Sequence, residues 1–439
     1  MKIANKKKTI IKWTAYWVLI LSVYVVLSII WRSFSVFCPI PLLAAFNFTV
    51  RIIIGLPMIK MKNERVLFWM KLTANLLSIA ATVYVFNMII RSGVQYNESY
   101  IDSLDYSVFD HNSTVTYNRE NGVYTIRAES DELRILQLTD IHICSSITTI
   151  GLDQKALKAC YEIIKSARPD LIIVTGDVVY TSPTKTFSKD NLNPIYQFCT
   201  FMNNIGIPWA MVYGNHDTEA IATYDEKSFE GIFRHFMADD NCPMLYAERQ
   251  PAVYGRYNQY LRLENSDGSL NRIVFLMDTN DYVRDSITVN DYDSIHKDQI
   301  EWYSETIDAV SEEQGEPVKS FVFMHIPFRE FADAKAALDA GSTKAEYLFG
   351  KNGEKTSCPD HNSGFFDVIL NKNSTEAVFV GHDHLNNMGI KYMGVDLIYS
   401  KSIDYIAYAG ISNLTEQRGG TLITVLPDKY KVEQIDYGQ

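Results

Sequence analysis

Residues 133–142 read LRILQLTDIH, an apolar run that ends in an aspartate and a histidine. Four further apolar runs end in a comparable way, in Thr175-Gly176-Asp177, Gly214-Asn215-His216-Asp217, His325 and Gly381-His382-Asp383-His384. Parallel strands of an α/β sheet end at one edge, and ligands bind in the crevice at that edge. The sequence therefore predicts that these polar side chains converge, although tens of residues separate them.

The fold class follows from the alternation of such runs with helix-like stretches. The runs over 171–174, 321–324 and 377–380 are apolar at every position, as in strands that are buried on both faces. Apolar residues recur at helical spacing over 152–167 and 298–310. Buried strands that alternate with helices indicate an α/β layered domain.

The residue types at these strand ends restrict the chemistry. Asp, His and Asn offer oxygen and imidazole nitrogen without a thiolate, which suits Mn, Fe, Zn or Co. A Cys-rich zinc site is disfavoured because the six cysteines show no CxxC spacing. The sequence does not decide whether one disulfide forms among the five cysteines that follow residue 91. One carboxylate can bridge two ions about 3.5 to 4 Å apart, and such a pair can hold the oxygens of a phosphoryl group.

The first 91 residues differ in composition from the rest of the chain. They contain twelve Lys and Arg residues against one acidic residue, whereas the remainder has 29 basic and 51 acidic residues. Uncharged runs over 13–31 and 72–90 are each long enough to cross a bilayer as a helix. A cleaved signal peptide is the alternative for the first run, but a small-residue cleavage site does not follow it.

A third apolar stretch, over 33–59, makes the number of membrane spans two or three. Pro39, Pro41, Pro57 and Arg51 disfavour a spanning helix there. Three spans place Lys60, which lies in a basic loop, on the same side as the N-terminal lysines, in agreement with the positive-inside tendency. We therefore expect a multi-pass plasma-membrane anchor in contact with lipid and an acidic body outside the cytoplasm; with two spans the body would be cytoplasmic.

The ordered motifs resemble those of one family. The set DxH, GD, GNHD, a lone histidine and GHDH, over about 133–439, is similar to the calcineurin-like metallophosphoesterases, near the purple-acid-phosphatase-29-like branch. The resemblance implies a four-layer α/β/β/α sandwich with two divalent or trivalent transition-metal ions, with Mn, Fe or Zn expected. We accordingly divide the chain into a membrane anchor over 1–92, a linker and lead-in hairpin over 93–130, and a catalytic domain over 131–439.

The same resemblance implies roles for individual residues. One metal ion would be held by Asp140, His142 and His384. The other would be held by Asn215, His325 and His382. Asp177 would bridge the two ions, His216 would protonate the leaving oxygen, and Asp217 would orient the His216 imidazole. Tyr180 stands where purple phosphatases have a metal-binding tyrosine, but their first motif lacks a histidine such as His142, so we expect Tyr180 not to ligate.

These features together predict a membrane-anchored phosphoesterase that hydrolyses phosphate mono- or diesters with a metal-bridging hydroxide. A metal-dependent nuclease is disfavoured because the acidic body lacks the cationic surplus that polyanion binding needs. A non-catalytic metal-binding membrane receptor is disfavoured because His216 is present beside every ligand candidate. The oligomeric state is left open.

Overall fold

The computed structural model describes residues 18, 22, 63–90, 97–146, 148–182, 185–186, 188–283 and 291–438. Its contacts divide the chain into two units. The first comprises 1–94, 145–149 and 181–190, and the second comprises 95–144, 150–180 and 191–439.

In the first unit, the helix α3 covers Glu64–Ile90. Asn63 begins it, because its side-chain oxygen accepts a hydrogen bond from the backbone N–H of Arg65 at 3.1 Å. A helix over 72–90 is therefore present as expected. Within the described residues, no helix combines the length and the apolar character needed to cross a membrane. Apart from Val18 and Ser22, the expected spans over 13–31 and 33–59 lie outside the described residues.

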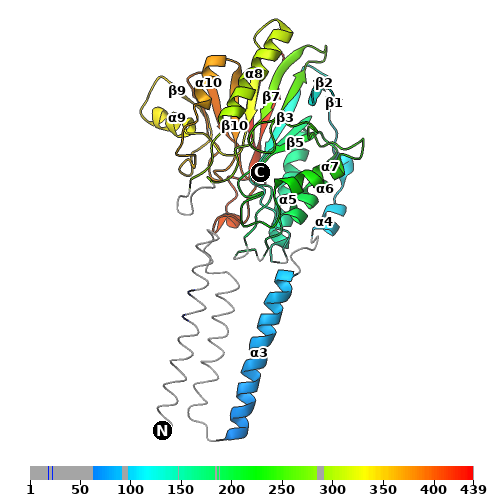
Figure 1. Ribbon diagram of the computed structural model, residues 1–439, viewed down its shortest axis with the longest axis vertical. Coiled ribbons are helices and arrows are strands. Elements are labelled where there is room, and N and C mark those ends of the chain that lie inside the picture. The colour runs from blue at the N-terminus through cyan, green and yellow to red at the C-terminus, as the bar shows by residue number, and fades with distance from the viewer. Residues whose placement is uncertain are drawn as a thin grey trace. The chain divides into compact units, whose positions relative to one another are not determined.

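The second unit contains two mixed β-sheets (Figure 1). The nine-stranded sheet has the order β1 (Ser113–Asn118), β2 (Val123–Ala128), β6 (Gln259–Glu264), β7 (Leu270–Leu276), β8 (Ser320–Phe323), β10 (Thr375–Val380), β12 (Val395–Tyr399), β11 (Gly389–Tyr392) and β9 (Ala345–Phe349). The five-stranded sheet has the order β14 (Tyr430–Asp436), β13 (Gly419–Val425), β3 (Leu133–Leu138), β4 (Leu171–Thr175) and β5 (Trp209–Val212).

Strand direction decides which loops meet. The neighbours β3, β4 and β5 are parallel, and so are β7, β8, β10 and β12. The carboxyl ends of each parallel set consequently lie along one edge of its sheet. Strands β4, β5 and β8 are buried at every residue, which explains why their sequences are continuously apolar.

Helices cover the outer faces of both sheets. The bounds of those in this unit are α4 (Glu98–Asp102), α5 (Ile150–Ala167), α6 (Leu192–Ile205), α7 (Glu226–Phe236), α8 (Lys297–Gln314), α9 (Glu330–Asp339) and α10 (Phe365–Lys372). Figure 1 shows α5, α6 and α7 on one side of the strands and α8, α9 and α10 on the other. Helix α5 contacts β3, β13 and β14 of the five-stranded sheet, and α10 contacts β10 of the nine-stranded sheet.

Two large hydrophobic clusters lie on opposite faces of the nine-stranded sheet and make up most of the core. Phe321 and Phe323 of β8 pack with side chains of the five-stranded sheet. Val322, the residue between them, packs with side chains of α8 and α10. Alternate residues of a strand point to opposite faces, so a strand that is apolar throughout can serve both layers. The order across the body is therefore helices, sheet, sheet and helices.

The hairpin expected before the body is present. Strands β1 and β2 pair antiparallel around Asn121 and Gly122, where Gly122 has φ of 74°. Strand β2 also pairs in parallel with β6. The hairpin is thus part of the nine-stranded sheet, whereas the division made from sequence placed it before the domain at 131.

Candidate metal centre

The backbone bends sharply just after the strands, where the polar residues of the site lie. Asp140, His142, Asp177 and His382 all have positive φ, between 51° and 74°. This left-handed conformation is uncommon for residues other than glycine, and non-glycine examples cluster at functional sites. All four residues are also buried. The strain is thus concentrated at the ends of β3, β4 and β10.

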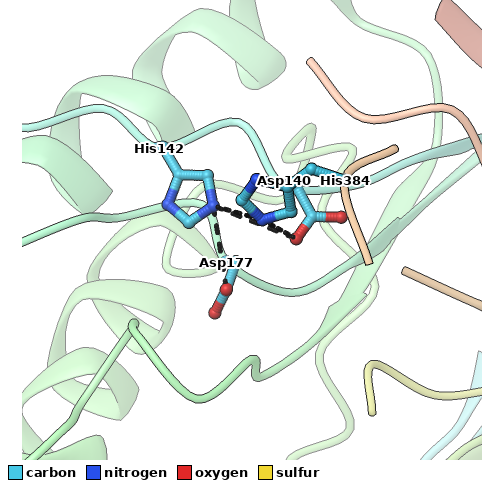
Figure 2. A group of neighbouring side chains, drawn as sticks. All are labelled: Asp140, His142, Asp177 and His384. Atoms are coloured by element: carbon cyan, nitrogen blue, oxygen red, sulfur yellow. Dashed lines mark hydrogen bonds and ion pairs between the residues drawn. The ribbon is translucent and has the colours of Figure 1, made fainter. Parts of the chain in front are cut away.

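One cluster contains Asp140, His142, Asp177 and His384, whose ligand atoms lie within 4.8 Å of one another. Figure 2 shows these four side chains turned toward a common point. Nε2 of His384 lies 3.2 Å from Oδ1 of Asp140 and 3.3 Å from Nε2 of His142. A carboxylate and two imidazoles converge here with nearly no exposure to solvent.

A second cluster contains Asp177, His325 and His382. Nε2 of His325 lies 3.2 Å from Oδ2 of Asp177 and 3.3 Å from Nδ1 of His382. Nδ1 of His325 donates to the backbone oxygen of Thr175 at 2.7 Å, which leaves Nε2 directed at the cluster. The last residue of β4 thereby fixes the ring of the histidine that follows β8.

Asp177 belongs to both clusters. Its Oδ2 lies 3.2 Å from Nε2 of His325 in one and 3.8 Å from Nε2 of His142 in the other. Its Oδ1 accepts a hydrogen bond from the backbone N–H of His216 at 2.8 Å. A carboxylate between two ligand sets has the geometry that a bridging ligand needs, although its bridging role stays a prediction.

Two glycines allow close approaches between strand ends, Gly214 to the Asp177 carboxylate and Gly381 to Thr139 and the Asp140 carboxylate. A Cβ added at Gly214 would lie 2.2 Å from Oδ1 of Asp177. A Cβ added at Gly381 would lie 2.0 Å from Oγ1 of Thr139 and 2.8 Å from Oδ2 of Asp140. All three distances are inside van der Waals contact, so any larger residue would push the carboxylates out of place.

The donor set fits transition-metal ions. The two clusters offer imidazole nitrogen and carboxylate oxygen without a thiolate, a combination suited to Mn, Fe, Zn or Co. Asn215 lies between Gly214 and His216, next to the Asp177 carboxylate, and its buried Oδ1 has no hydrogen-bond partner. A buried oxygen without a hydrogen-bond partner destabilises the folded chain unless a bound cation interacts with it.

The protonation of the histidines also suits metal binding. Burial lowers the pKa of His142 to about 4 and the pKa of His382 to about 3, so both rings are neutral and present a lone pair at neutral pH. Burial also disfavours charge on His325, but Asp177 outweighs it and raises the pKa of that ring to about 9. A bound cation would have to displace that proton.

His216 lies at the rim of the clusters and is partly exposed. Its ring centroid is 5.5 Å from that of His142. The expectation that Asp217 orients this imidazole is wrong. Asp217 is fully buried and accepts hydrogen bonds from the backbone N–H groups of Asp177, Val179 and Gly214. It therefore holds the loops after β4 and β5 together.

The carboxylate beside His216 comes from a residue that the sequence did not single out. Oε1 of Glu219 lies 3.3 Å from Nδ1 of His216, an ion-pair distance. Burial disfavours the charged imidazole, but Glu219 and Asp177 outweigh that effect and raise the pKa of His216 to about 9. The ring is consequently protonated at neutral pH.

A second residue missed from sequence is Asp404, which follows β12. Its Oδ2 lies 2.9 Å from Nδ1 of His384. Its Oδ1 accepts from the backbone N–H groups of Ile406 and Ala407. Arg418, which is buried, donates to the backbone oxygen of Asp404 at 3.1 Å. Asp404 is thus rigidly held behind His384, on the side away from the cluster.

Tyr180 packs with its ring edge against His142 and His216, at centroid distances of 5.3 and 5.0 Å. Burial raises the pKa of its hydroxyl, which disfavours the phenolate form that would bind a metal. That Tyr180 does not ligate stays a prediction. No disulfide links the five cysteines in the described part of the chain, so the bridge considered from the sequence does not form among them.

Comparison with known proteins identifies the family. The model of the family described as calcineurin-like phosphoesterase matches residues 133–386, more than half of the chain. The chain belongs to this family. Its matched segment begins with β3 and ends just beyond His384, so it includes both clusters.

Two plant relatives and one solved structure are similar to the chain. The chain is 27% identical over 305 residues to a protein of Arabidopsis thaliana named probable inactive purple acid phosphatase 14, covering 63% of this chain and 72% of the relative. It is also 27% identical to probable inactive purple acid phosphatase 29 of the same plant, covering 68% and 78%. A solved dimetal phosphatase from Danio rerio superposes with a TM-score of 0.41 at 11% identity, covering 70% of this chain and 97% of that one.

Proposed function

We propose that this calcineurin-like phosphoesterase is an active hydrolase that cleaves phosphate mono- or diesters with two transition-metal ions. The observation that carries the proposal is the pair of buried ligand clusters that share Asp177. In this assignment Asp140, His142 and His384 hold the first ion, and Asn215, His325 and His382 hold the second. We refer to these as the first and the second metal position.

Two ions bound there would activate water as a nucleophile at neutral pH and stabilise charge on the phosphoryl oxygens. The chain's own residues supply the remaining steps. Asp177 keeps its carboxylate fixed by accepting the His216 backbone N–H, and Asp217 ties the supporting loops together. The donor atoms are thereby preorganised, so little rearrangement is needed on binding.

His216 is the proposed general acid. Its Nδ1 faces Glu219, which leaves Nε2 as the nitrogen that can give a proton to the leaving oxygen. In the metal-free chain Glu219 and Asp177 outweigh burial and raise the pKa of this ring, and Glu219 stays beside it as a neighbour that favours the protonated form. Partial exposure of the ring gives a substrate access to it, in contrast to the fully enclosed rings of the ligand candidates.

A second candidate function is a metal-binding protein without catalytic activity. It is favoured by the names of the two plant relatives, both of which contain the words probable inactive. The presence of His216 beside an intact ligand set argues for the active form. The two candidates differ in turnover and not in metal content.

The experiment is a substrate panel on the purified full-length chain, supplied in turn with Mn²⁺, Fe²⁺, Zn²⁺ and Mg²⁺. The panel includes alkyl and aryl phosphate monoesters, phosphodiesters, nucleotides, and single-stranded and duplex DNA. Hydrolysis of a small ester with Mn²⁺, Fe²⁺ or Zn²⁺ is the expected result. A chain that binds two ions and hydrolyses none of these compounds would instead be the non-catalytic metal-binding protein.

We also propose that the N-terminal part anchors the chain in the plasma membrane with the body outside the cytoplasm. The support is the basic, apolar composition of residues 1–91 together with large apolar side chains exposed on α3, among them Phe68, Trp69 and Ile79. Protease added to intact cells should digest the body. Protection until the membrane is permeabilised would place the body in the cytoplasm instead.

A further inference from the structure

The segment after β7 brings a tyrosine to the second metal position. Tyr282 lies six residues beyond the end of β7, after a bend in which Asn280 has φ of 59°. Oδ1 of Asp278 accepts the backbone N–H of Asn280 at 2.8 Å and holds this bend. From there the Tyr282 hydroxyl oxygen accepts a hydrogen bond from Nδ2 of Asn215 at 3.3 Å.

A second tyrosine supports the first. Tyr282 and Tyr292 form an antiparallel β-bridge, flanked by hydrogen bonds from Val283 N–H to Asp291 O and from Asp293 N–H to Asp281 O. Their rings stack at a centroid distance of 5.3 Å and an angle of 25°. The Tyr292 ring also meets His382 edge-on at 4.6 Å. The pair thus touches Asn215 and His382, two ligand candidates of one metal position.

The Asn215 side chain has two different ends. Its Nδ2 donates to Tyr282, while its Oδ1 is buried and has no hydrogen-bond partner. A cation attracts the amide oxygen and repels the amide N–H₂ group, so only one orientation of the side chain serves as a ligand. In that orientation the buried N–H₂ group needs an acceptor, and the Tyr282 hydroxyl supplies it.

We propose that Tyr282 is a positioning residue that holds Asn215 with its oxygen toward the second metal position. This inference rests on the proposed dinuclear centre, and it adds that the second ion depends on the segment after β7. The first ion has a separate support, because Asp404 contacts His384. The affinities of the two positions can therefore be changed one at a time.

Tyr282→Phe is the direct test, because it keeps the ring and the stacking with Tyr292 but removes the acceptor. Loss of a residue that orients a metal ligand costs about 10- to 100-fold in metal affinity. We expect a loss of this size for the second ion and an unchanged affinity for the first. The matched control is Tyr292→Phe, which removes only a hydroxyl from the other ring and keeps the ring contacts with Tyr282 and His382 as well as the Asn215–Tyr282 hydrogen bond.

The measurement is a stepwise calorimetric titration of the metal-free full chain with Mn²⁺, with metal content after gel filtration as a second readout. Wild type and Tyr292→Phe should bind two ions, and Tyr282→Phe should bind one ion tightly and the other weakly. Two ions bound to Tyr282→Phe with wild-type affinities would overturn this inference alone, as would an equal weakening of both ions. A wild-type chain that binds fewer than two ions would overturn the proposed function and this inference with it.

Discussion

Oδ2 of Asp404 lies 2.9 Å from Nδ1 of His384, behind the ring and away from the metal clusters. A carboxylate in this place fixes the tautomer of a metal-binding histidine, because Nδ1 carries the proton and Nε2 keeps its lone pair for the ion. Nε2 of His384 does point at the first position, 3.2 Å from Oδ1 of Asp140. This contact therefore links a loop after β12 to the first ion.

Asp404→Asn should weaken binding of the first ion. The backbone N–H groups of Ile406 and Ala407 would keep the amide oxygen, which turns the amide N–H₂ toward Nδ1 of His384. The imidazole would then carry its proton on Nε2, the nitrogen needed by the ion. We expect a loss of about 10- to 100-fold in affinity for one ion, measured by calorimetric titration. Unchanged binding of both ions would contradict this role.

Gly214→Ala should disturb the centre without changing a ligand. The added Cβ would lie 2.2 Å from Oδ1 of Asp177, so the carboxylate must move. We expect reduced content of both ions and a drop in activity, with metal analysis as the readout. Gly231→Ala on α7 is the matched control, since a Cβ there meets no atom within 4 Å. Equal metal content in the two variants would show that the close approach at Gly214 is unimportant.

His216→Ala should separate metal binding from chemistry. The side chain is not among the ligand candidates, so both ions should remain. General acid catalysis contributes about 10² to 10⁴ in rate and matters most when the leaving oxygen is basic. We therefore expect turnover of an alkyl phosphate to fall by about this factor and turnover of a nitrophenyl ester to fall much less. Wild-type turnover of the alkyl ester would exclude the assigned role.

Metal affinity should rise with pH. Asp177 outweighs burial and raises the pKa of His325 to about 9, and Asp140 and Asp404 do the same for His384, which they hold well above its usual value. Both rings are thus protonated in the metal-free protein at neutral pH, and an ion must displace those protons. Affinity should increase as pH approaches about 9, because less proton displacement is then needed.

Calorimetry at neutral pH in two buffers of different ionisation enthalpy measures this proton release directly. His142 and His382 should add nothing to it, because burial lowers the pKa of their rings to about 4 and about 3. Binding enthalpies that are equal in the two buffers would mean that no proton leaves, and would contradict the assigned protonation.

The sequence predicted those site residues that come directly after a strand. Asp140, Asp177, His325 and His384 were identified because each follows a largely apolar run, and strands β3, β4, β8 and β10 end within one residue of those runs. A search for polar residues after every apolar run would also have identified Asp404, because the run over 395–399 is β12, the parallel neighbour of β10. The same search would have identified Tyr282 if it had extended six residues beyond the end of β7.

Other features had no signal in the sequence. Glu219 lies in a loop after the GNHD motif, and only the backbone path shows that its carboxylate, rather than that of Asp217, faces His216. Strand β14 was missed because it lies at the edge of its sheet, where alternate residues are exposed and the apolar run is interrupted. Strands β9 and β11 were missed because Glu346 and Lys391 interrupt their apolar residues, and β9 has no buried residue.

The central claim is that two ions sharing Asp177 make this chain a phosphoesterase. The measurement that tests it most directly is the rate of ester hydrolysis as Mn²⁺ is added stepwise to metal-free protein, for wild type and for Asp177→Asn. Activity of the wild type should appear with the second equivalent of ion, and Asp177→Asn should bind neither ion firmly and stay inactive. Equal rates in the two proteins, or full wild-type activity with one equivalent, would contradict the account.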